Sequence, residues 1–228
     1  MTASPSKLLF LPGASGNTEF WRPAAERLAH PAQQVHIGWP GFGSTPPDPS
    51  VTGMADLVAR VLPEIDQPTA LVAQSMGGIV AVCTALERPE QVTHLVLTVT
   101  SGGVDMLALG AQDWRPDFAA ANPNLPRWFL DDRTDLTARL AELHMPVLLL
   151  WGDADPISPV RVGQRLAELL PCAELHVIPG GGHDLGSTHA AEVARLIDRH
   201  LASPLQTQSS GVSLRVANHG HLDGGGQG

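Results

Sequence analysis

The sequence predicts an α/β fold, a doubly wound and mostly parallel sheet of six strands. Six short apolar segments alternate with segments whose apolar residues recur at helical spacing, which is typical of a parallel sheet wrapped by helices. The chain has 228 residues, a suitable length for one such domain with a well-buried core. The sequence contains neither an internal repeat nor a sign of a second domain.

The expected strands are solid apolar runs rather than alternating ones. Lys7 to Leu11 is the first example, and such runs are typical of strands buried on both faces. The expected strands are 7–11, 34–37, 70–73, 94–99, 145–151 and 174–178.

The helices expected between these strands follow from apolar spacing and from helix-breaking residues. Met54, Leu57, Val58, Val61 and Leu62 lie on one helical face. The helix after residue 75 must end before a proline at position 89. The expected helices are 18–29, 54–65, 76 to before 89, 159–170 and 188–201.

Composition and charge restrict the partners that the protein could have. Hydrophobic residues make up 43% of the chain and charged residues 16%, which is a globular balance. A net charge of −9 argues against nucleic acid or a membrane as a partner. The apolar run from Leu8 to Pro12 is too short for a signal or a membrane span. Cys83 and Cys172 fit a reducing compartment, so we expect a cytoplasmic protein.

One serine is placed where a strand meets a helix. Residues 71–81 (LVAQSMGGIVA) predict a buried strand, a sharp turn at Ser75 and a helix that opens on two glycines. Residues two before and two after such a turn must be small, and Ala73 and Gly77 are. The serine oxygen would then stand above the N-terminus of the helix, where free N–H groups favour negative charge.

Two further reactive side chains follow later strands. Asp155 lies after the fifth strand, and His183 lies in a glycine-rich loop after the sixth. Because ligands of parallel sheets bind at the carboxyl ends of the strands, Ser75, Asp155 and His183 are expected to meet. A neutral imidazole could remove the serine proton, and a carboxylate could orient the ring. Asp153 is interpreted as a solvated turn residue.

A serine activated in this way could attack a carbonyl carbon, which is an acyl-transfer reaction. The carbonyl oxygen then becomes negative and needs two N–H groups to stabilise it. The backbone N–H of Met76, at the start of the helix, could supply one. The second is expected from Ala14, in the loop after the first strand.

The segment from about 101 to 144 is expected to form a short cap over the site, because connections this long often carry function. Trp114 and Phe118, with Leu107 and Leu109, predict an apolar acyl or aryl site there. Phe42, in the loop after the second strand, is a further candidate for the pocket wall. We expect residues 1–202 to form the domain and residues 203–228, rich in glycine and polar residues, to form a flexible tail.

These segments together resemble the α/β-hydrolase superfamily, in particular its small, capped, esterase-like serine hydrolases. The resemblance covers residues 7 to about 202 and rests on five segments in order: LPGA at 11–14, PGFGS at 40–44, QSMGG at 74–78, WGDAD at 151–155 and GH at 182–183. It implies a triad of Ser75, Asp155 and His183, with no metal or cofactor. The chain departs from the family in having Pro12 where a histidine is frequent and Ala73 where the first glycine of G-x-S-x-G stands.

The resemblance implies hydrolysis of a carboxylic ester of a small or medium apolar group through an acyl-enzyme. Hydrolysis of a carbon–carbon bond or an enol-lactone by the same triad remains an alternative. A non-catalytic ligand-binding protein on a hydrolase fold is a third hypothesis, and acyl transfer to an alcohol or amine a fourth. A small-molecule ester is the expected partner, and the oligomeric state is unknown.

Overall fold

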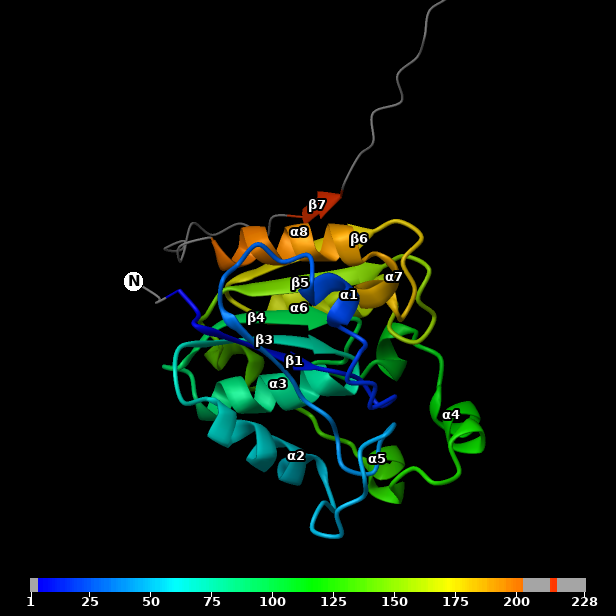
Figure 1. Ribbon diagram of the computed structural model, residues 1–228. Coiled ribbons are helices and arrows are strands. Elements are labelled where there is room, and N and C mark those ends of the chain that lie inside the picture. Colours follow the sequence, from blue (N-terminus) through cyan, green and yellow to red (C-terminus); the bar gives the residue numbers. More distant parts are fainter. Residues whose placement is uncertain (1–3, 203–213, 217–228) are drawn as a thin grey trace, which may run out of the picture.

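The computed structural model describes residues 4–202 and the backbone of 214–216. Its strands form one sheet in the order β2-β1-β3-β4-β5-β6-β7, and every pairing is parallel (Figure 1). The six predicted strands are confirmed, each within two residues of the expected ends. They are β1 (Lys7–Leu11), β2 (Gln33–His36), β3 (Thr69–Gln74), β4 (Val92–Thr98), β5 (Val147–Gly152) and β6 (Ala173–Ile178).

A seventh strand, which the sequence analysis did not predict, extends the sheet. β7 (Leu214–Val216) pairs with β6 and lies within the segment that was expected to be a flexible tail. The other parts of that expected tail, 203–213 and 217–228, lie outside the described residues.

The helices that wind around the sheet include all those expected. They are α1 (Arg22–Ala25), α2 (Met54–Val61), α3 (Met76–Glu87), α6 (Val160–Leu169), α7 (Leu185–Thr188) and α8 (Ala190–Leu201), with a short 3₁₀ turn, η1 (Leu62–Glu64), after α2.

α1 is much shorter than the helix expected over 18–29. Pro23 lacks an N–H group and takes the second position of the helix, which places the helix start at Arg22. Arg27 and Leu28 then make tighter backbone bonds, each to the third preceding residue. The carboxylate of Asp198, in α8, then accepts the N–H groups of Ala29 and His30, which the helix would otherwise have used.

The winding reverses direction beside β1, and this reversal defines the ligand edge of the sheet. The chain runs from β1 outward to β2, and then returns to the other side of β1 to form β3. Because such crossovers are right-handed, the reversal places α1 on one face and α2, α3 and α6 on the other. α8 packs against α1. In sheets of this kind the crevice at the reversal binds the ligand.

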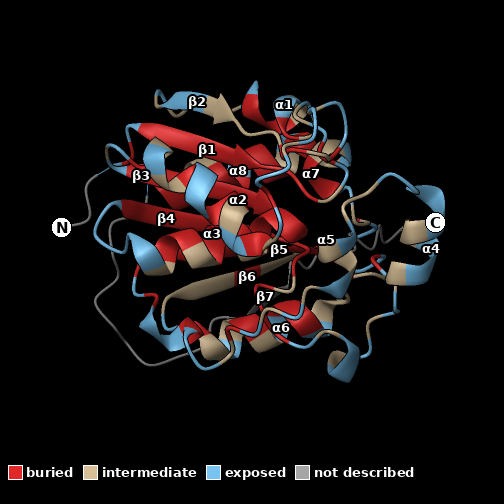
Figure 2. Ribbon diagram, turned by 90° about the horizontal axis from the view of Figure 1, so that it is seen from below, coloured by how far each residue is buried: buried red, intermediate tan, exposed pale blue. Residues whose placement is uncertain are grey.

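The core lies between the sheet and these two helical layers. Figure 2 shows the strands β1, β3, β4 and β5 buried along their whole length, with exposed residues on the outer faces of the helices. The largest fully buried side chains are Trp21, Trp39, Trp151, Phe10 and Phe42. This close-packed base fixes the strand ends, from which the site is built.

The segment between β4 and β5 stands beyond the carboxyl ends of the strands (Figure 1). It contains η2 (Leu107–Leu109), α4 (Arg115–Ala121), α5 (Arg127–Asp131) and η3 (Leu140–Glu142), and no strand within its described residues. We call residues 101–144 the cap.

Candidate active site

Ser75 occupies the sharp turn that the sequence predicted between β3 and α3. Its backbone has φ 52° and ψ −122°, a conformation that residues with side chains rarely adopt. Two bonds hold it there: its N–H donates to the Thr98 carbonyl at 3.0 Å, and the Thr100 hydroxyl donates to its carbonyl at 2.6 Å. The turn is therefore fixed from the end of β4.

Small residues around Ser75 are required because other segments of the chain approach the turn closely. A Cβ atom on Gly77 would lie 2.5 Å from the Pro12 carbonyl oxygen, and one on Gly78 would lie 2.3 Å from the Thr100 hydroxyl oxygen. Gly13 has no room for a side chain either, since a Cβ atom on it would lie 3.0 Å from the Cβ atom of Ser75. The loop after β1 thus lies directly against the serine turn.

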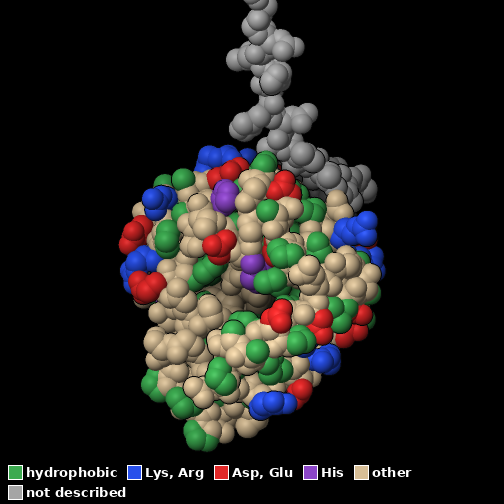
Figure 3. All heavy atoms as spheres, turned by 90° about the vertical axis from the view of Figure 1, so that its right-hand side faces the viewer, with side chains coloured by type: hydrophobic (Ala, Val, Ile, Leu, Met, Phe, Trp, Pro, Cys, Tyr) green, Lys and Arg blue, Asp and Glu red, His purple; other side chains and the backbone are tan. Residues whose placement is uncertain are grey.

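The three predicted reactive side chains meet at this edge. His183 Nε2 lies 3.0 Å from Ser75 Oγ, and His183 Nδ1 lies 2.8 Å from Asp155 Oδ2. The Asp155 side chain is fully buried, while that of His183 is 25% exposed. The imidazole therefore faces an open crevice on one side and an enclosed carboxylate on the other. Figure 3 faces this edge of the molecule and shows a central hollow.

The two loops that carry Asp155 and His183 are bonded to each other. Asp155 Oδ1 accepts the N–H groups of Ile157 and Ser158, which leaves Oδ2 to the histidine. Asp153, predicted to be a solvated turn residue, is exposed and also accepts the Gly180 N–H at 2.7 Å. The loops after β5 and β6 therefore form one unit.

Gln74 connects the histidine loop to the serine turn, and the sequence analysis did not single it out. Its side chain is buried, and Nε2 donates to the His183 carbonyl at 3.0 Å. Its position next to Ser75 could have indicated this role. Thr100 could likewise have been found, because it follows the end of β4.

The two predicted N–H groups remain available for a ligand. Ala14 and Met76 lie on the loop after β1 and at the first position of α3. No hydrogen bond among the described residues uses either N–H group. Met76 lacks an acceptor because the first N–H groups of a helix have no intrahelical partner.

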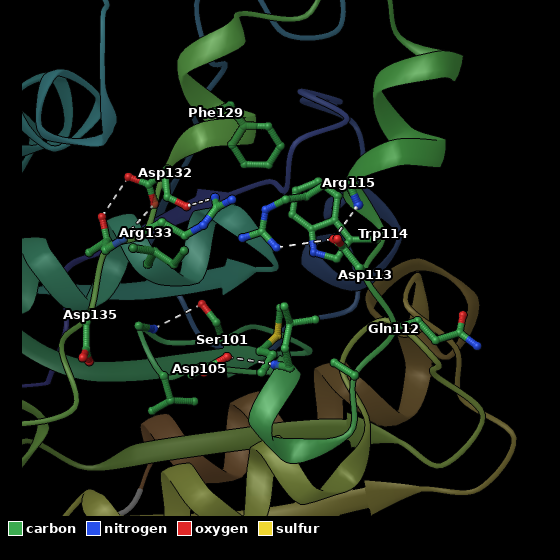
Figure 4. Close-up of a pocket in the computed structure, with 17 residues that line it drawn as sticks. Ser101, Asp105, Gln112, Asp113, Trp114, Arg115, Phe129, Asp132, Arg133 and Asp135 are labelled. Atoms are coloured by element: carbon green, nitrogen blue, oxygen red, sulfur yellow. Dashed lines mark hydrogen bonds and ion pairs between the residues drawn. The ribbon is translucent and has the colours of Figure 1, made fainter.

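A cavity of about 430 Å³ lies beneath the cap, in the volume range of small-molecule sites (Figure 4). Its wall includes Ile79, one helical turn along α3 from Ser75, and the cap residues Met106, Leu107, Trp114 and Phe129. Ser75, Asp155 and His183 do not themselves line this cavity, and Ile79 is the wall residue that connects it to the serine turn along α3.

Only part of the predicted apolar wall lines this cavity. Trp114 and Leu107 do, whereas Leu109, Phe118 and Phe42 do not. Phe118 packs behind Trp114, with ring centroids 5.6 Å apart. Phe42 is only 1% exposed and its ring lies 5.6 Å from that of Phe129, so it supports the cap from below. Phe129, Arg115 and Arg133 were not predicted, because their place depends on how the cap folds back.

The thiol of Cys83, on α3, is not a reactive group. Burial raises the pKa of the Cys83 thiol to about 11, which keeps it protonated and unreactive. The described residues contain no group of three His, Cys, Asp or Glu side chains that could hold a metal ion. None of the helices in the described part of the chain is long and apolar enough to cross a membrane.

The fold and this geometry agree with what comparison to known proteins finds. The model of the alpha/beta hydrolase family matches residues 8–196, and the chain belongs to that family. This confirms the resemblance inferred from the sequence.

Among curated relatives, a 2-hydroxy-6-oxononadienedioate/2-hydroxy-6-oxononatrienedioate hydrolase of Cupriavidus pinatubonensis is 25% identical, over 82% of each chain. A pimeloyl-[acyl-carrier protein] methyl ester esterase of Edwardsiella ictaluri is 26% identical, over 79% of this chain and 87% of its own. Among solved structures, a lipase-esterase related protein from Clostridium acetobutylicum superposes with a TM-score of 0.71 at 17% identity, over 88% of this chain and 96% of that one. These relatives are hydrolases of ester and of other bonds.

Proposed function

We propose that the protein is a serine hydrolase that cleaves carboxylic esters through an acyl-enzyme. The observation that carries this proposal is the unbroken chain of contacts from Ser75 Oγ to His183 Nε2 and from His183 Nδ1 to Asp155 Oδ2, at 3.0 and 2.8 Å. The serine belongs to a strained turn at the N-terminus of α3. A strained serine bonded to a histidine is the arrangement that activates a nucleophile.

In the first step Ser75 Oγ attacks the ester carbonyl carbon and passes its proton to His183 Nε2. Asp155 accepts the Nδ1–H of the ring, which selects the tautomer with Nε2 free and stabilises the imidazolium. The carbonyl oxygen becomes negative and accepts the N–H groups of Ala14 and Met76. When the intermediate collapses, the alcohol leaves with the proton from Nε2, and the acyl group remains on Ser75.

Water completes the cycle by the same route in reverse. It gives a proton to His183 Nε2 and attacks the acyl carbon, and Ser75 leaves with that proton as the acid is released. The chemistry uses only side chains and backbone amides of this chain. Both cysteines are free in the structure, which supports a reducing compartment, and we propose the cytoplasm as the place of action.

The wall of the cap cavity supports a substrate of small or medium size. Ile79, Val104, Met106 and Phe129 give the cavity an apolar side, and Ile79 lies one helical turn along α3 from Ser75. Its volume of about 430 Å³ suits a short acyl or aryl group rather than a long lipid chain.

The proposal is tested by replacing the nucleophile and measuring hydrolysis of para-nitrophenyl esters of short acids. We expect Ser75→Ala to lower kcat by at least about 10⁴-fold, because the other groups have no nucleophile to activate. Ser187→Ala is the matched control: its hydroxyl lies near the histidine loop but bonds only to the Asp184 carbonyl. Activity that survives in Ser75→Ala, with circular dichroism unchanged, would contradict the proposal.

Hydrolysis of a carbon–carbon bond is the second candidate, and the similarity to 2-hydroxy-6-oxononadienedioate hydrolases favours it. The same serine and histidine would serve a vinylogous diketone in place of an ester. Comparing kcat/KM for para-nitrophenyl esters and for such diketones separates the two. A protein that hydrolyses neither, yet binds a ligand in the cavity, would instead be a non-catalytic binder.

A further inference from the structure

A guanidinium group without a hydrogen-bond acceptor lines the cap cavity. Arg115 begins α4, and its side chain is only 25% exposed. Its Nε atom is buried and makes no hydrogen bond to the described residues. Its Nη1 forms a long ion pair with Asp113, whose Oδ1 lies 3.6 Å away. Donors of a partly buried cation are rarely left unsatisfied, so this group is suited to an acceptor that enters the cavity.

The orientation of Arg115 is fixed by an aromatic ring. Its Cζ atom lies 5.0 Å from the ring centroid of Trp114, which also lines the cavity. A guanidinium held over an aromatic face keeps its plane and its charge directed to one place. The acceptor site is therefore present before a ligand arrives.

A second guanidinium comes from the other side of the cavity. Arg133 follows α5, and its Nη1 donates to the carbonyl oxygens of Leu130 and Asp132 at 2.9 and 2.8 Å. These two carbonyls hold the group in place without neutralising it. Figure 4 shows the guanidinium ends of Arg115 and Arg133 pointing toward each other. Two such groups match the oxygens of one carboxylate.

The four carboxylates of the cavity wall are already engaged by their own loops. Each one accepts a backbone N–H two residues further along the chain, at 2.9 to 3.3 Å. The acceptors Asp105, Asp113, Asp132 and Asp135 bond in this way to Leu107, Arg115, Thr134 and Thr137. Their hydrogen bonds thus serve to shape the loops, and Asp113 in addition forms the long ion pair with Arg115.

We propose that Arg115 and Arg133 bind a carboxylate at the far end of the substrate's acyl chain, so that the preferred substrates are monoesters of dicarboxylic acids. The proposal rests on the proposed ester hydrolysis at Ser75. The apolar wall at Ile79, Met106 and Phe129 takes the methylene groups between the two ends. The cavity thereby selects a chain by its charge and its length.

The test compares para-nitrophenyl monoesters of dicarboxylic acids, from succinic to sebacic, with para-nitrophenyl esters of the methyl-ended acids of equal length. We expect the charged ester to have the higher kcat/KM at one chain length. Arg115→Gln and Arg133→Gln should lower the ratio of charged to neutral kcat/KM by about 10- to 100-fold, mostly through KM, since each removes charge-assisted bonds. Arg127→Gln, an exposed arginine on α5 that does not line the cavity, is the control and should keep the wild-type ratio.

Two results would overturn the arginine site: neutral esters preferred at every length, or a ratio that Arg115→Gln leaves unchanged. If no ester is hydrolysed and Ser75 takes no covalent label, the proposed function fails instead. Calorimetry with the free dicarboxylates then tests whether the arginine site binds a carboxylate. Binding that Arg115→Gln weakens supports it, and absence of binding by the wild type overturns it.

Discussion

Ser75, Gly77 and Gly13 show how a few residues set the geometry of the site. The serine accepts a positive φ because Thr98 and Thr100 bond its backbone, and the glycines allow the loop after β1 to lie against it. The strain brings the serine oxygen above the sheet and the Ala14 and Met76 amides to the same place. A substitution that adds one atom here should therefore act on both stability and activity.

Gly77→Ala is the sharpest such substitution. Its Cβ would meet backbone atoms of Pro12 and Leu11, which cannot rotate away. We expect a loss of about 1–3 kcal/mol in the free energy of unfolding, measured with urea, and a loss of ester hydrolysis. Gly53→Ala is the control, because nothing lies within 4 Å of its Cβ and its backbone is extended. Equal stability of the two variants would show that the turn tolerates a side chain.

Residues differ in how far the sequence reveals them. Ser75, Asp155 and His183 stand in short motifs that follow strands, so both their chemistry and their common edge could be predicted. Arg115 stands in no such motif, and Gln74 stands in QSMGG without its bond to the His183 loop being evident from that segment. Their positions depend on contacts between segments far apart in the chain, which spacing along the sequence does not encode.

Among the elements, α8 and β4 enclose a pair of histidines. Both His94 and His200 are buried, with ring centroids 5.1 Å apart. Burial, with the His94 ring beside it, lowers the pKa of His200 to about 3 from an ordinary value of 6.5. The α8 helix therefore packs on the sheet with an uncharged His200.

This pair predicts a pH dependence of stability. The unfolded chain binds a proton at His200 more readily than the folded one. The uncharged His200 therefore makes its full contribution to the free energy of unfolding above its ordinary pKa of 6.5, and this contribution is lost as the pH falls toward 3. From pH 7 to pH 5 we expect a loss of about 2 kcal/mol from this residue, measured by urea unfolding. His200→Leu should remove this part of the dependence of the unfolding free energy on pH. An identical slope in wild type and variant would contradict the assignment.

The elements also differ in how well spacing predicted them. The buried strands were placed within two residues, because apolar runs between loops leave few alternatives. α1 was overestimated, since Pro23 places its start at Arg22 and Asp198 accepts the N–H groups of Ala29 and His30 beyond its end. β7 was missed because its three residues stand in a polar segment whose composition favours no strand. In the cap, aromatic content predicted a site but not which rings would face it.

At the scale of the whole molecule, the reversal beside β1 brings loops from five strands to one edge. The loop after β1 brings Ala14, the loop after β3 brings Ser75, β4 supports the turn, and β5 and β6 lead to Asp155 and His183. The cap lies over the same edge with its own cavity. The order of segments along the chain could predict this convergence, because the parallel fold dictates where strand ends meet.

The central claim, that this convergence makes Ser75 a nucleophile, is tested most directly by covalent labelling with a fluorophosphonate probe and peptide mapping by mass spectrometry. We expect one label, on Ser75, in the folded wild type, much slower labelling in His183→Ala, and unchanged labelling in Ser187→Ala. A folded wild-type protein that takes no label at Ser75, or labels equally fast without His183, would contradict the account.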